Sequence, residues 1–168
     1  MEAPVSPAPS KVAAALVTWS PPTGWDFSEY ANSGGADPVV AYERASDRIT
    51  IKIFGAPGSF YKNPAGFMAG PSATTMGRPP VRLGEERVLG QTVTVYRHEY
   101  PLPDGDPHAT APRPPRMARE IYCVLPAIPD GRFAVLTYAR ESPAPDMKGT
   151  GDKAWKKFLA GVRRVRKH

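Results

Sequence analysis

Residues 117–140, MAREIYCVLPAIPDGRFAVLTYAR, contain two apolar runs on either side of a turn. The runs cover residues 117–125 and 132–140, and the Asp130-Gly131 pair between them suits a tight turn. In both runs apolar residues occupy odd and even positions alike, so both faces of each strand would be buried. Strands of this kind belong in the middle of a sheet with layers above and below it. This hairpin therefore predicts a layered fold around a central sheet.

Alternating residues before this hairpin predict further strands. In residues 48–54, RITIKIF, the three isoleucines share one face while Thr50 and Lys52 point to the other, so this strand is expected to be covered on one side. The strands expected before the hairpin lie at residues 16–19, 39–44, 48–54, 81–89 and 92–100. Because alternating βαβ units are absent, the predicted fold class is α+β, with an antiparallel sheet of about six or seven strands.

Two helices are expected to pack on this sheet. Asn63 can cap a short helix that starts at Pro64, a position at which the missing amide hydrogen is tolerated. The final stretch, residues 148–168, repeats apolar residues at spacings of three and four, which predicts a long amphipathic helix. Its buried stripe would contain Trp155, Phe158, Leu159, Val162 and Val165.

The excess positive charge of the chain is confined to the same final stretch. Residues 148–168 contain eight Lys or Arg and one acidic residue, a charge of +7, whereas the rest of the chain has fourteen against fifteen, a charge of −1. A solvated helix face is the ordinary explanation, and an anionic lipid surface, an acidic partner or nucleic acid is the functional one. Nucleic acid is disfavoured because Trp155 and Phe158 belong to the buried stripe and would leave no aromatic platform for bases. The candidate contacts for an anionic partner are Lys156, Lys157, Arg163, Arg164, Arg166 and Lys167.

No residue pattern indicates a catalytic, cofactor-binding or metal-binding role. Asp104, Asp106 and His108 form the best metal-like group, but they offer three ligands at most, so a solvated turn and a metal site both stay open. His98 and Glu99 are neighbours on a strand and point to opposite faces, so they cannot form an acid–base pair. His98 is expected to have a surface partner instead. The protein is therefore predicted not to be an enzyme.

The beginning of the chain bears on its domain organisation and location. Residues 1–11 are rich in Pro and Ala and predict a disordered leader, and residues 12–168 are expected to form a single α+β domain. Such a leader often follows a signal or lipoprotein cleavage site, which favours a periplasmic or secreted protein, with or without a lipid anchor; a cytoplasmic protein is the alternative. No apolar run approaches the ~18 residues that a membrane span needs. The single cysteine, Cys123, excludes an internal disulfide and is expected to be a buried, inert thiol.

The order of these elements resembles the PsbP-like superfamily over residues 17–165. The points of likeness are the Pro-Thr-Gly-Trp25 turn, the strand with Ile49, Ile51 and Ile53, the short helix before the Gly90 hairpin, the strand at 132–138, and a final helix with Trp155, Phe158 and Leu159. The resemblance implies an α/β/α sandwich with an antiparallel central sheet. It also implies a non-enzymatic accessory or binding protein, and it transfers no functional residues. The Pro-rich segment at 102–116 departs from the pattern.

The function predicted from the sequence is that of a non-catalytic accessory or binding domain without a cofactor. Its interaction surface would involve two long loops, residues 55–80 and 102–116, because loops of this length are uncommon unless they are functional or mobile. The partner would be an unknown protein or a small ligand. The alternative is a binder of nucleic acid or anionic surfaces that uses the basic C-terminal helix.

Overall fold

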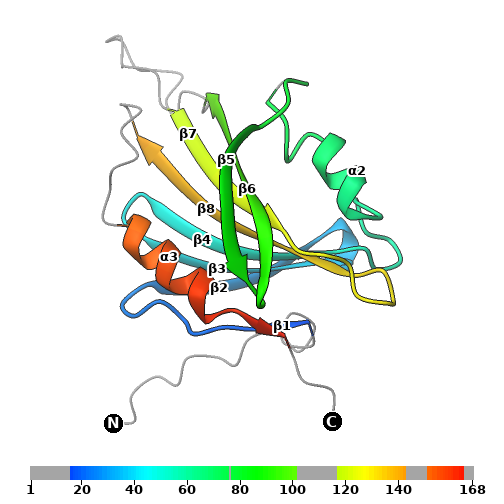
Figure 1. Ribbon diagram of the computed structural model, residues 1–168, viewed down its shortest axis with the longest axis horizontal. Helices are drawn as coiled ribbons and strands as arrows, with labels where there is room; N and C mark the ends of the chain where they lie inside the picture. Colours follow the sequence, from blue (N-terminus) through cyan, green and yellow to red (C-terminus); the bar gives the residue numbers. More distant parts are fainter. Residues whose placement is uncertain (1–15, 76, 102–116, 143–150, 165–168) are drawn as a thin grey trace.

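The computed structural model describes residues 16–75, 77–101, 117–142 and 151–164. About half of these residues belong to one antiparallel sheet (Figure 1). Its strands are β2 (Asp26–Asn32), β3 (Asp37–Arg44), β4 (Asp47–Phe54), β5 (Val81–Val88), β6 (Gln91–Pro101), β7 (Met117–Val124) and β8 (Phe133–Ser142). The order across the seven-stranded sheet is β2-β3-β4-β8-β7-β6-β5. Two short strands, β1 (Val17–Thr18) and β9 (Arg163–Arg164), pair separately.

The predicted antiparallel sheet is confirmed, and the hairpin at residues 117–140 lies at its centre. β8 is the fourth of the seven strands and pairs with β4 on one side and β7 on the other. The sequence prediction missed β2, which lies at one edge of the sheet. Its seven residues are mostly exposed, so they carry no apolar alternation from which a strand could be predicted.

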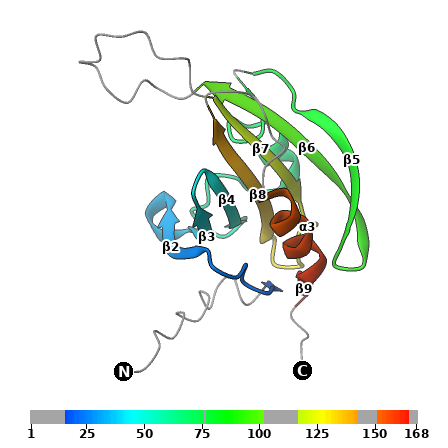
Figure 2. The same cartoon turned by 90° about the vertical axis from the view of Figure 1, so that its left-hand side faces the viewer.

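The expected α/β/α sandwich, with helices layered on the sheet, is wrong. The molecule is mostly one sheet, and its helices are short: α2 (Pro64–Ala69) has 6 residues and α3 (Gly151–Gly161) has 11. The reason is visible in Figure 2: the sheet bends into an arc, and α3 lies on its inner side. Val40 and Tyr42 of β3 share one hydrophobic cluster with Val88 and Val93 from the other end of the sheet. The curved sheet therefore encloses much of its own core and leaves room for little helix.

The C-terminal helix is shorter than the sequence predicts. The part of the apolar stripe that the structure describes is buried as expected, with Trp155, Phe158 and Leu159 each no more than 3% exposed. However, α3 ends at Gly161, and the following residues form β9, whose Arg163 pairs with Thr18 of β1. Arg163 and Arg164 are therefore not on a helix. Val165, Arg166 and Lys167 lie outside the described residues.

Side chains alternate between an inner face, which packs against α3, and an outer face. The inner face carries Ile49, Ile51 and Ile53 of β4, all fully buried. On the outer face, α2 and the loop after it cover a second cluster, built from Phe54, Tyr61, Phe67, Ala73, Tyr122, Phe133 and Val135. The predicted start of α2 is confirmed, because the Asn63 side chain accepts a hydrogen bond of 2.7 Å from the Gly66 amide and Pro64 is the first helical residue.

One glycine fixes the connection from β4 to α2. Gly55 has a φ of +92°, and a Cβ atom there would lie 2.2 Å from the carbonyl oxygen of Gly131. The loop after β4 and the turn before β8 can therefore touch only because residue 55 has no side chain. Buried Asp37 holds the same loop, since its carboxylate accepts hydrogen bonds from the Ser59 hydroxyl and the Phe60 amide.

Several predictions from the sequence fall on residues that the structure does not describe. These are the leader at 1–11, the loop at 102–116 and the metal-like group Asp104, Asp106 and His108. No helix in the described part of the chain has the length and apolar character that crossing a bilayer requires.

Cys123 should react with thiol reagents only after unfolding. It is fully buried on the inner face, and burial, with a smaller contribution from the charge of Glu86, raises the pKa of its thiol from 9.0 to about 12. At pH 8 we therefore expect only about one thiolate in 10⁴ molecules. A chromogenic disulfide reagent should detect no thiol in the native protein and one per chain in denaturant.

The raised pKa of Cys123 also makes the stability of the fold depend on pH. Because the folded state holds the Cys123 proton more tightly than the unfolded state, the buried thiol stabilises the fold fully below about pH 9, and this stabilisation is lost as the pH rises towards 12. Fast labelling of native protein at pH 8 would contradict the buried placement of this thiol.

Candidate functional site

The outer face of the sheet is apolar at one end and polar at the other. Where α2 covers it, the facing residues are large and apolar, such as Tyr122, Phe133 and Val135. Further along β8 the outward residues become Thr137, Ala139 and Glu141, and this part is not filled by α2. A pocket of about 290 Å³ lies over it. The pocket is the candidate functional site.

The pocket is hollow because small side chains form its floor and large ones form its walls. In one row across the sheet, Arg48 of β4 pairs with Ala139 of β8, and Ala139 pairs with Glu120 of β7. Alanine in the middle of this row leaves space between the arginine and the glutamate. The remaining lining includes Tyr30, Thr50, Lys52, Tyr100, Ala118, Thr137 and Glu141.

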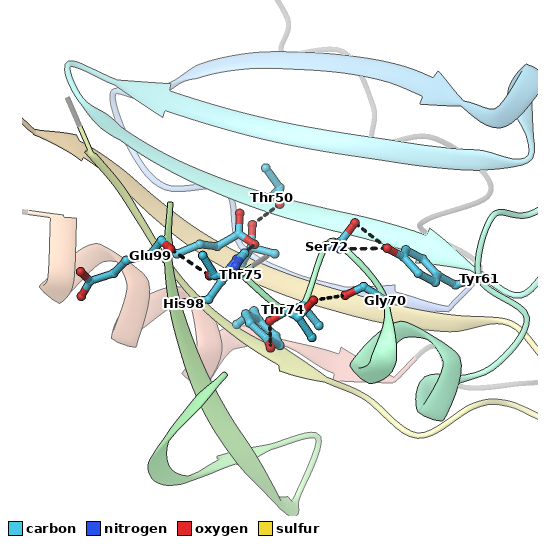
Figure 3. Close-up of polar contacts among 12 residues, drawn as sticks. Thr50, Tyr61, Gly70, Ser72, Thr74, Thr75, His98 and Glu99 are labelled. Atoms are coloured by element: carbon cyan, nitrogen blue, oxygen red, sulfur yellow. Dashed lines mark hydrogen bonds and ion pairs between the residues drawn. The ribbon is translucent and has the colours of Figure 1, made fainter. Parts of the chain in front are cut away.

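Thr50 and Thr137 meet at the floor of the pocket (Figure 3 labels Thr50). Thr50 and Thr137 are direct partners across β4 and β8, and their hydroxyl groups form a hydrogen bond with each other. They are only 3% and 1% exposed. The bond uses one of the two hydroxyl hydrogens, so the pair keeps one donor and several lone pairs for another partner.

His98 and Glu120 form a buried polar pair beside the floor. His98 Nε2 lies 3.1 Å from Glu120 Oε1, and the side chains are 6% and 12% exposed. His98 Nδ1 is buried and has no hydrogen-bond partner. The expectation of a surface partner for His98 is therefore wrong. The expectation that His98 and Glu99 face opposite ways is confirmed, because Glu99 Oε1 lies 2.7 Å from Nε of Arg119 on the inner face.

Charges from three strands act on the phenol of Tyr100 at the pocket wall. Burial raises its pKa, the negative charges of Glu120 and Glu141 raise it further, and Arg48 lowers it. The phenol therefore keeps its proton at neutral pH and can donate a hydrogen bond. The charged side chains that act on Tyr100 come from β4, β7 and β8, so side chains of these three strands meet at the pocket wall.

The two cations of the pocket differ in their contacts. The Arg48 guanidinium donates a hydrogen bond of 2.6 Å to the Tyr30 hydroxyl, and its Nε lies 3.4 Å from Glu43 Oε1. Lys52 is half-buried and, within the described part of the chain, has neither an ion pair nor a hydrogen bond. Lys52 is therefore the cation of this site that is available to a ligand.

The hydroxyl groups of the neighbouring loop are used to hold the loop in place (Figure 3). The Tyr61 hydroxyl donates to Ser72 Oγ at 2.8 Å, Thr74 Oγ1 donates to the Gly70 carbonyl at 3.0 Å, and Thr75 Oγ1 donates to the Glu99 carbonyl at 2.8 Å. These bonds tie the loop after α2 to itself and to β6. Much of the predicted interaction loop at 55–80 is therefore packed against the sheet.

Among the predicted anionic contacts, Lys156, Lys157 and Arg163 do not line this pocket. Lys156 and Lys157 are exposed on α3, on the inner side of the arc. Lys157 lines a separate groove of about 420 Å³ together with Trp25 and Phe158. Arg163 Nη1 donates to the carbonyl oxygens of Ala160, at 2.6 Å, and Val162, at 2.9 Å. Arg164 lies in β9.

Sequence reasoning missed the residues of the pocket, among them Arg48, Lys52, Glu120 and Thr137. The one available signal was that polar residues alternate with isoleucines in β4. Over the described ranges, no group of three His, Cys, Asp or Glu residues is placed to hold a metal ion. No family model matches the chain, and no curated protein matches it. The PsbP-like resemblance therefore stays a prediction.

Proposed function

We propose that this protein is a non-catalytic binding protein that takes a small polar ligand into the outer-face pocket. The observation that carries the proposal is the polar, uncovered end of an otherwise well-packed sheet face, with a half-buried lysine that lacks a partner among the described residues. An ammonium group that no described protein group engages can donate charge-assisted hydrogen bonds to a ligand. A small polar ligand in the pocket would use it.

The contacts of the polar groups favour binding over catalysis. A hydroxyl nucleophile needs a base within hydrogen-bond distance, oriented by a third group. Here the hydroxyls of Thr50 and Thr137 bond to each other, while His98 uses Nε2 to contact Glu120. Cys123 is fully buried on the inner face. The contacts among these side chains fix the shape of the pocket and the positions of its polar groups, which is what a binding site requires.

Filling the pocket tests the proposal. Ala139 is half-buried between Arg48 and Glu120, so Ala139→Leu should occupy the hollow. Wild-type protein is screened against a broad panel of small metabolites by thermal melting. A ligand at a hundred times its Kd should stabilise the fold by about 2.7 kcal/mol. For a chain of this size that is a rise of about 5–10 °C in Tm.

The control has the same substitution on an exposed helix surface. Ala160 of α3 is exposed, so Ala160→Leu should keep the ligand-dependent rise while Ala139→Leu loses it. If every rise persists in Ala139→Leu, or if no compound of the panel changes the Tm of the wild-type protein, the pocket does not have this function.

A further inference from the structure

We infer that the ligand of the outer-face pocket is a hydroxylated organic anion whose carboxylate or phosphate group binds to Lys52. This inference rests on the function proposed above and specifies its ligand class. It follows from how charge and hydroxyl groups are distributed over the pocket, and it commits to a single small molecule.

The anionic group is assigned from the surroundings of Lys52. Its cross-strand neighbours, Val39 of β3 and Val135 of β8, are 1% and 0% exposed. The ammonium therefore leaves the sheet beside apolar side chains, and no carboxylate among the described residues pairs with it. The ammonium is partly exposed in the pocket and is not engaged by another described side chain. An oxyanion beside Lys52 would form charge-assisted hydrogen bonds with it.

The hydroxyl groups are assigned from the rest of the pocket. Thr50 lies two residues before Lys52 on the same strand and face, so its side chain starts about 7 Å from that of Lys52. The Thr50–Thr137 pair offers a donor and acceptors, and the Tyr100 phenol offers another donor. Glu120 and Glu141 are carboxylates, which accept hydrogen bonds from ligand hydroxyls. A ligand with several hydroxyl groups can use these donors and acceptors, whereas a purely apolar anion cannot.

The size of the pocket restricts the ligand further. Its volume of about 290 Å³ is at the lower end for small-molecule sites, which span ~300–1,000 Å³. One sugar-sized unit fits such a space, and a polymer does not. Sugar acids and sugar phosphates have the required combination of one anionic group, several hydroxyls and small size.

Calorimetric titration with four probes tests the inference. The probes are D-glucuronate, D-glucose 6-phosphate, neutral D-glucose and inorganic phosphate. We expect at least one acidic sugar to bind at least tenfold more tightly than glucose and inorganic phosphate. Lys52→Met removes the charge and keeps a long side chain, so it should reduce the affinity for that acidic sugar to the level of glucose. Lys52→Arg keeps the charge and should retain binding even if Lys52→Met folds poorly.

Lys62→Met is the matched control, because Lys62 is exposed and does not line the pocket. It should leave every affinity unchanged. The inference would be overturned if neither acidic sugar bound more tightly than glucose, or if the affinity were unchanged in folded Lys52→Met. Binding of none of the four probes would also overturn it. The proposed binding function is tested separately by the broad panel and Ala139→Leu. If that panel finds a neutral or cationic ligand, the pocket is still a binding site, but its ligand is not an anion.

Discussion

Replacing Trp155 with alanine is expected to lower the free energy of unfolding by about 3–5 kcal/mol. Trp155 is 3% exposed and is the largest side chain that α3 inserts into the inner core. Its ring stacks on Tyr138 of β8 at 6.1 Å between centroids and on Phe158 of the same helix at 6.0 Å. Removing it deletes these contacts and leaves a cavity that a well-packed core cannot fully close.

The expected loss is large compared with the stability of a typical domain. Domains are stable by about 5–15 kcal/mol, so a loss of this size would remove a large share of it. Equilibrium unfolding in denaturant, followed by far-UV circular dichroism, measures the change. Lys153→Ala in the same helix is the control, because Lys153 is exposed and should change stability by less than about 0.5 kcal/mol. A loss below about 1 kcal/mol for Trp155→Ala would mean that α3 contributes little to holding the inner face together.

Trp155 also illustrates which parts of the fold could be predicted from the sequence. Its spacing from Phe158 and Leu159 is a local pattern, and local patterns identified α3, the cap of α2 at Asn63 and most of the strands. The failures concern contacts between distant parts of the chain. The bending of the sheet brings Val40 and Val93 into one hydrophobic cluster, and no local period of the sequence encodes that arrangement. The same bending is why the sandwich prediction failed.

The candidate site was harder to predict for the same reason. In β4, Thr50 and Lys52 face away from the isoleucines, and that face was expected to be uncovered. Thr50 is in fact 3% exposed, because its partner is Thr137, 87 residues later in the chain. His98 likewise meets Glu120 only through the pairing of β6 with β7. The sequence of one strand therefore shows which of its positions are polar. Only the order of the strands in the sheet shows which polar residues of different strands lie side by side.

The outer face depends on one phenylalanine in the same way as the inner face depends on Trp155. Phe67 of α2 is 1% exposed, and its ring lies 5.0–5.8 Å from those of Tyr61, Phe54 and Tyr122. A helix of 6 residues is too short to be stable by itself, so α2 exists because of this packing. We therefore expect Phe67→Ala to lower the free energy of unfolding by about 3–5 kcal/mol and to make residues 61–75 susceptible to limited proteolysis.

The chain offers a control with the same chemical change in the same region. Phe60 is 64% exposed, so Phe60→Ala should change stability by less than about 0.5 kcal/mol and leave the proteolysis pattern unaltered. If both variants lose the same small amount, the loop is held by its hydrogen bonds, such as that from the Tyr122 hydroxyl to the Ala73 carbonyl, and not by Phe67. If only Phe67→Ala is destabilised, the apolar half of the outer face is held by α2. Because Tyr122 and Glu120 are two residues apart on one face of β7, the same variant should then also weaken ligand binding in the polar half.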